Sequence, residues 1–241
     1  MSPLTLSIVL GLAAGLADYI GGLVLVQRSP SARALRYFVA LGSGFMLSAA
    51  MLEMVPESMR FGVKWSSLLI LLGYCGVHLV QHTITPHFHF GEETHHGEFL
   101  SARTTYSVLL GLAMHTFFDG VAIASGFTLS NWLGWVIFLA IFLHKVPEGF
   151  TVASVMLAGG QSKRTAVNSA LFLGGTTVAG VLVIGLAPSL VRFGLPLSAG
   201  VTIYVAATEL VPEVNREPGI RMALVFFLGV ALFFVLRLLA P

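Results

Sequence analysis

Residues 132–157 read WLGWVIFLAIFLHKVPEGFTVASVML, and this stretch decides the class of fold. It is longer than the roughly 20 apolar residues that an α-helix needs to cross a bilayer. It nevertheless carries His144, Lys145 and Glu148 near its middle. Seven other apolar stretches surround it in the chain. The predicted membrane spans are 4–26, 35–57, 65–84, 102–126, 132–157, 165–187, 196–214 and 220–239.

The composition supports the same class. Of the 241 residues, 56% are hydrophobic and only 10% are charged, whereas soluble domains carry about 25% charged residues. Eight spans use about 160 residues, so residues 1–241 are predicted to form a single all-α, polytopic transmembrane domain. The basic residues are scattered and the net charge is +2, which excludes a nucleic-acid partner. The compact length and lack of a targeting extension favour a bacterial inner membrane.

The basic residues predict the orientation, because Lys and Arg are enriched in cytoplasmic loops. If the N-terminus lies outside, eight of them fall on the inner side and four on the outer side. We therefore expect both termini to lie outside the cytoplasm. The inner set is Arg28, Arg33, Arg36, Arg103, Lys163, Arg164, Arg216 and Arg221.

Two motifs place a histidine and a carboxylate four residues apart on consecutive spans. The first runs from His115 to Asp119 and is followed by glycine, and the second runs from His144 to Glu148 and is also followed by glycine. Residues four apart share one helix face. Both histidines lie about 18 Å from a membrane surface, at about 1.5 Å per residue. The four side chains are therefore expected to converge near the middle of the bilayer.

Imidazole nitrogens together with carboxylate oxygens suit zinc foremost, and also iron, manganese, cobalt or nickel. An ionised side chain in the middle of a bilayer needs a partner, a water cavity or an ion. The alternative is an internal network of hydrogen bonds and ion pairs that holds no metal. Two such motifs on neighbouring spans favour the metal site.

Two further motifs are near-copies, Glu53-Met-Val-Pro-Glu57 and Glu209-Leu-Val-Pro-Glu213. They lie on spans that the predicted topology runs in opposite directions. Spans 1–3 and 6–8 are therefore expected to be inverted repeats around a central pair, spans 4 and 5, as in many transporters. The four glutamates would lie along a permeation path, on either side of the central site.

The segment at about 82–101 is a histidine-rich loop, predicted to be cytoplasmic, and such tracts indicate weak, exchangeable metal binding. The isolated Asp18 of the first span is expected to be satisfied by local packing. The candidate loop ligands are His82, His87, His89, His95 and His96.

At the motifs of spans 4 and 5 the chain resembles the ZIP (Zrt/Irt-like) family of divalent-metal transporters, in its prokaryotic form. The resemblance implies transport of Zn²⁺ or a similar cation toward the cytoplasm, by a protein that forms a homodimer. It also assigns the metal site to His115, Asp119, His144 and Glu148. Some members bind a second metal through an Asn and an Asp, where this chain has Thr116 and Lys145. We therefore expect one metal, with the Lys145 ammonium standing in for the charge of the second.

Three functions are compatible with these residues. The favoured one is a transporter that is not an enzyme and needs no catalytic cofactor, with the metal as its cargo. The second is an intramembrane zinc-dependent hydrolase, although the His-Glu-x-x-His and Gly-x-Ser-x-Gly motifs are missing. The third is a proton or sodium antiporter, which would leave the histidine pair unexplained.

Overall fold

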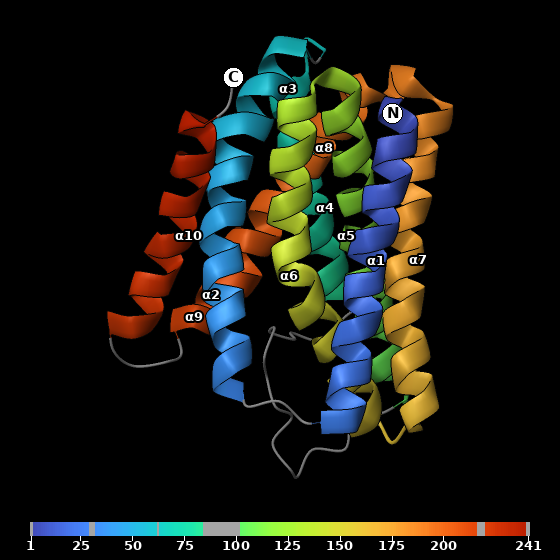
Figure 1. Cartoon of the computed structure of the whole chain (residues 1–241). Helices are drawn as coiled ribbons and strands as arrows, with labels where there is room; N and C mark the ends of the chain where they lie inside the picture. The colour runs from blue at the N-terminus through green and yellow to red at the C-terminus, as the bar shows by residue number, and fades with distance from the viewer. Residues whose placement is uncertain (1, 29–31, 62, 84–101, 216–219, 240–241) are drawn as a thin grey trace.

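The computed structural model describes residues 2–28, 32–61, 63–83, 102–215 and 220–239, and every element within them is a helix. The helices lie side by side in one bundle, and the start of α1 and the end of α10 lie at the same end of it (Figure 1). In chain order they are α1 (Pro3–Arg28), α2 (Ala32–Ala49), η1 (Ala50–Met54), α3 (Val55–Phe61), α4 (Ser66–Thr83), α5 (Ala102–Leu129), α6 (Asn131–Ala158), α7 (Lys163–Leu186), η2 (Pro188–Leu190), α8 (Val191–Tyr204), η3 (Val205–Leu210), α9 (Val211–Asn215) and α10 (Ile220–Leu238).

Seven stretches of the described chain are long and apolar enough to cross a membrane. They agree with all the predicted spans except the third. The third span is the helix α4, whose C-terminal half carries the polar residues His78, Gln81 and His82 and so lowers its hydropathy. It nevertheless lies within the bundle against α8. The prediction of an all-helical, polytopic membrane protein is confirmed.

The two Glu-x-Val-Pro-Glu motifs have the same backbone structure. A π-helical turn comes directly before each motif's Val-Pro pair, η1 in the first and η3 in the second. Glu53 is the next-to-last residue of η1, and Glu209 is the next-to-last residue of η3. A proline removes one backbone donor and disturbs the preceding turn, and π-turns are rare and often mark functional sites. The near-copies in the sequence are therefore also copies in structure.

The helix contacts follow the symmetry of an inverted repeat. Helices α1, α5, α6 and α7 form one group, to which the pairs α2–α10 and α4–α8 are attached through α6 and α5. The repeat relates α1 to α7, α2 to α8, α4 to α10 and α5 to α6. Under this exchange the pair α2–α10 becomes the pair α8–α4. The same exchange converts the α1–α6 contact into the α7–α5 contact. This arrangement places α5 and α6 at the centre.

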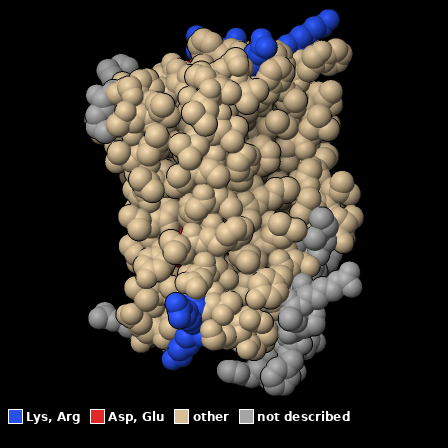
Figure 2. Space-filling view, turned by 90° about the vertical axis from the view of Figure 1, so that its right-hand side faces the viewer, with Lys and Arg blue, Asp and Glu red and all other residues tan. Residues whose placement is uncertain are grey.

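The outer surface is apolar, as a lipid-facing surface must be. On α10, for example, Leu224, Phe227 and Leu228 are exposed. Figure 2 shows one face of the molecule on which Lys and Arg gather at the two ends, separated by a wide band without them. The charged residues at the middle of the bundle are instead buried inside it.

One predicted boundary was wrong. The seventh span was expected to begin at residue 196, but α8 begins at Val191 and contains Pro196 within its second turn. A proline is most easily tolerated at the start of a helix, but α8 contains Pro196 in its interior. The helices α6 and α7 do begin at recognisable N-caps, since the hydroxyls of Ser130 and Ser162 accept hydrogen bonds from Leu133 N and Thr165 N.

Candidate metal centre

The two His-xxx-carboxylate motifs pair across the contact between α5 and α6. The Nε2 atom of His115 lies 3.0 Å from Oε1 of Glu148, and Nε2 of His144 lies 3.4 Å from Oδ2 of Asp119. The His144 nitrogen also lies 3.9 Å from Oε2 of Glu148. Each histidine therefore faces the carboxylate of the other helix, and these contacts bring the four side chains together between α5 and α6.

The surrounding protein holds these side chains in place and shields them from solvent. All four are buried, with at most 2% of any residue exposed. The Nδ1 atom of His144 lies 3.0 Å from the carbonyl oxygen of Ala140, which turns Nε2 toward the carboxylates. The hydroxyl of Thr116 lies 2.5 Å from Oε1 of Glu148 and 2.8 Å from the carbonyl oxygen of Leu112. Outer contacts of this kind orient metal ligands in many proteins.

The glycine that follows each carboxylate lets another helix approach closely. A Cβ atom at Gly120 would collide with the backbone of Thr177 on α7, and one at Gly149 would collide with the backbone of Asp18 on α1. The glycines of the two motifs therefore explain how α1 and α7 pack backbone to backbone against the central helix pair.

Lys145 lies inside the cluster rather than beside it. Its Nζ atom lies 2.7 Å from Oε2 of Glu148, 2.9 Å from Oδ2 of Asp119 and 3.6 Å from Oδ2 of Asp18. The expectation that Asp18 is satisfied by local packing was therefore wrong. Asp18 is fully buried and belongs to the charged cluster. An aspartate and a lysine within two different membrane spans each need a counter-charge, so the sequence could have predicted that they pair.

The donor set and its spacing fit a metal ion. Donor atoms of His115, Asp119 and Glu148 all lie within 4.8 Å of one another. Two ligands on one tetrahedral zinc, each about 2.0–2.1 Å from it, are about 3.4 Å apart. The 3.4 Å separation between His144 and Asp119 has this value. The residues can therefore ligate a divalent cation after small side-chain adjustments.

The structure gives three of the four predicted path glutamates partners of their own. Glu53 pairs with Arg237, at 3.2 Å between Oε1 and Nε, and Glu57 pairs with Arg60 at 3.0 Å. Glu209, which is 3% exposed, accepts a hydrogen bond from Gln81. For Glu213 only the backbone is described, and it lies in α9.

Of the predicted loop histidines, His82 lies in α4, where its ring lies against that of His78 with the ring centroids 3.9 Å apart. His87, His89, His95 and His96 lie outside the described residues.

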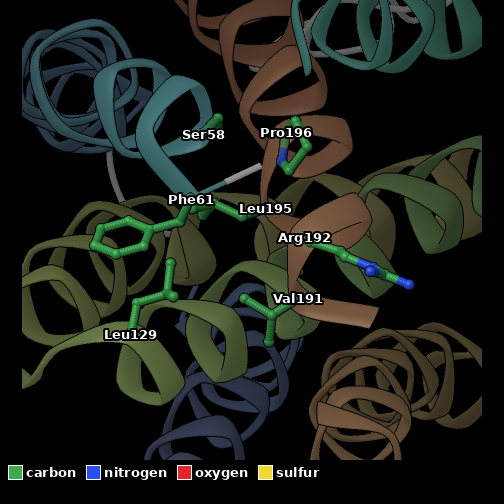
Figure 3. Close-up of a pocket in the computed structure, with 7 residues that line it drawn as sticks. All are labelled: Ser58, Phe61, Leu129, Val191, Arg192, Leu195 and Pro196. Carbon is green, nitrogen blue, oxygen red and sulfur yellow. The ribbon is translucent and has the colours of Figure 1, made fainter. Parts of the chain in front are cut away.

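A small pocket opens elsewhere, between α3, the end of α5 and the start of α8 (Figure 3). Its lining includes Phe61, Leu129 and Leu195, and the close-up shows Arg192 extending away from Phe61 and Leu129. It contains none of the four predicted ligands. The histidine and carboxylate cluster is therefore separate from this pocket.

The fold and the buried cluster define a polytopic membrane protein with a candidate metal site between its two central helices. Residues 91–237 match the family model described as "ZIP Zinc transporter". The chain is 30% identical over 238 residues to the zinc transporter ZupT of Escherichia fergusonii, covering 90% of this chain and 91% of that protein. This chain belongs to the ZIP zinc transporter family, whose members are transporters rather than enzymes. The hydrolase alternative is thereby set aside.

Two eukaryotic relatives match a smaller part of the chain. The zinc transporter foi of Drosophila melanogaster is 27% identical over 141 residues, which is 52% of this chain. The human zinc transporter ZIP4 is 30% identical over 126 residues, which is 51% of this chain. In each case the match spans only 20% of the relative, so the likeness is confined to part of a much longer protein.

Proposed function

We propose that this chain carries Zn²⁺ across the bilayer and holds it, midway, with His115, Asp119, His144 and Glu148. The observation that carries the proposal is the cross-pairing of two histidines and two carboxylates from neighbouring helices in a fully buried cluster. Nitrogen and oxygen ligands of this kind bind zinc well. Ionisable residues buried within a membrane protein are costly, and they mark ion or substrate pathways.

The direction of transport is proposed to be toward the cytoplasm, with both termini outside. The distribution of basic residues along the sequence supports this orientation. On this basis Glu53 and Glu57 lie toward the outer side, and Glu209 and Glu213 toward the inner side. The repeated π-turns that present Glu53 and Glu209 support a role for both in the path.

Lys145 is proposed to replace the charge of a second metal, so that the site holds one ion. The support is its position, because the ammonium is within hydrogen-bonding distance of both Glu148 and Asp119. The protein is further proposed to reside in a bacterial inner membrane as a homodimer. The ZupT relatives are bacterial, and light scattering of the purified protein would test the dimer.

The transport proposal is tested by metal uptake into proteoliposomes. Zn²⁺ uptake should be saturable for the wild type and fall by at least about tenfold in His115→Ala and in Glu148→Gln, because each removes a ligand or its charge. Met114→Ala is the matched control, since Met114 is a neighbouring side chain on α5 that packs on the apolar core. Normal uptake by both ligand variants would contradict the proposed site.

A further inference from the structure

The ammonium of Lys145 contacts one oxygen of each of the two carboxylates that are proposed to bind the metal. It contacts Oε2 of Glu148 at 2.7 Å and Oδ2 of Asp119 at 2.9 Å. A lysine ammonium has three donors and no acceptor. One of them bonds Glu148, and Oδ2 of Asp119 lies within reach of another. The arriving cation must therefore compete with Lys145 for both carboxylates.

Asp18 is the carboxylate of this cluster that lies farthest from the ammonium. Its side chain is fully buried on α1, and neither of its oxygens accepts a hydrogen bond from the described part of the chain. The Lys145 ammonium lies 3.6 Å from Oδ2 of Asp18, which is longer than the roughly 2.7–2.9 Å of a charge-assisted hydrogen bond. A buried carboxylate without hydrogen bonds is costly. A shift of Lys145 by about 1 Å would supply one.

We propose that Asp18 receives the Lys145 ammonium when a divalent cation takes Asp119 and Glu148. This inference rests on the proposed metal site and adds a positioning residue to it. Lysine has a flexible four-carbon stem, so the ammonium can change partners without a movement of the backbone. The metal and the ammonium then no longer compete for the same oxygens.

The formal charges support this exchange. With all three carboxylates ionised and the histidines neutral, Asp18, Asp119 and Glu148 contribute −3 and Lys145 contributes +1, so these residues sum to −2. One divalent cation brings that sum to zero, whereas a monovalent cation leaves a buried net charge. Asp18 therefore matches the cluster to a doubly charged cargo.

The packing of α1 against α6 fixes Asp18 at the height of Lys145. Gly149 faces the backbone of Asp18, and Gly21 faces the backbone of Val146 and Phe150. The two helices are thus in backbone contact at Asp18 itself and one turn further along α1. The distance between the two groups is set by this contact rather than by flexible side chains alone.

A double-mutant cycle on detergent-purified full-length protein tests the exchange, with Co²⁺ titration followed by absorbance. We expect Asp18→Asn to weaken Co²⁺ binding by about tenfold in the wild-type background, because the displaced ammonium loses its acceptor. In the Lys145→Met background the same substitution should change binding by less than about threefold. An equal loss in both backgrounds would mean that Asp18 acts only by its charge, and would overturn the proposal.

A zinc-bound structure of the wild type provides a test that does not depend on the folding of variants. We expect Nζ of Lys145 to lie within hydrogen-bonding distance of Asp18 and to leave Oε2 of Glu148. Lys145 still bound to Asp119 and Glu148 beside the ion would overturn the proposal. If the wild type binds no Co²⁺, or His115→Ala binds it equally well, the proposed metal site fails and this inference falls with it. Binding that His115→Ala abolishes, combined with no coupling between Asp18 and Lys145, overturns the exchange alone.

Discussion

Replacing Gly149 by alanine should separate α1 from α6. The added Cβ would collide most severely with the carbonyl oxygen of Asp18, and would also lie 2.6 Å from its carbonyl carbon and 2.8 Å from its Cα, where ordinary contacts are 3.4–4 Å. These are backbone atoms and cannot rotate away, so α1 must move by about 1 Å. The overpacking costs about 1–3 kcal/mol, partly offset by the roughly 0.5–1 kcal/mol that alanine gains over glycine in a helix.

The assay is unfolding of the purified protein in mixed micelles, together with Co²⁺ titration. We expect Gly149→Ala to lower the free energy of unfolding by about 1–2 kcal/mol and to weaken Co²⁺ binding, because Asp18 moves away from Lys145. Gly175→Ala on α7 is the matched control. No atom lies within 4 Å of a Cβ built at Gly175, so this variant should be neutral or slightly more stable. Equal stability and binding in the two variants would refute the argument that backbone contact fixes the site.

Three further predictions concern other positions. Lys145→Asp should bind two Zn²⁺ rather than one, as measured by elemental analysis, because it removes the ammonium that is proposed to replace the charge of a second metal. An unchanged stoichiometry would contradict this role of Lys145. Glu209→Ala should reduce Zn²⁺ uptake, whereas its Co²⁺ affinity should stay within about threefold of the wild-type value, because Glu209 is proposed to line the path and not to bind the metal. A loss of Co²⁺ binding as large as that of His115→Ala would make Glu209 a ligand instead. Ser162→Ala should lower the free energy of unfolding by about 1 kcal/mol, because it removes the hydroxyl that caps α7, and unchanged unfolding would show that this cap contributes nothing.

Much of the fold follows from local sequence properties. Runs of apolar residues predicted the spans, since length and hydropathy are sufficient to define a membrane helix. The polar residues of α4 did not prevent that helix from being recognised, because its first half is strongly apolar. The start of α8 was missed since Pro196 can stand either at the beginning of a helix or within it. The π-turns were not predicted, because a proline predicts a disturbed turn without specifying its form.

Part of the candidate site could likewise be predicted from the sequence, and part of it could not. The convergence of His115 and His144 with Asp119 and Glu148 could be predicted, because spacing on a helix and depth in a bilayer are both readable from sequence. That Asp18 and Lys145 each need a counter-charge was readable from the sequence, but the geometry of their contact depends on how α1 packs against α6 across a large separation in the chain. That packing is decided by small residues such as Gly21 and Gly149, whose partners are visible only in three dimensions.

The two π-turns are alike, but the groups that hold their glutamates are not. Glu53 is held by the guanidinium of Arg237, whose side chain is 47% exposed, whereas Glu209 is held by the uncharged amide of Gln81. Added salt weakens an exposed ion pair and leaves a bond to a neutral amide largely unaffected. A molecule with nearly symmetric halves thus has two ends that respond differently to the ionic strength around them.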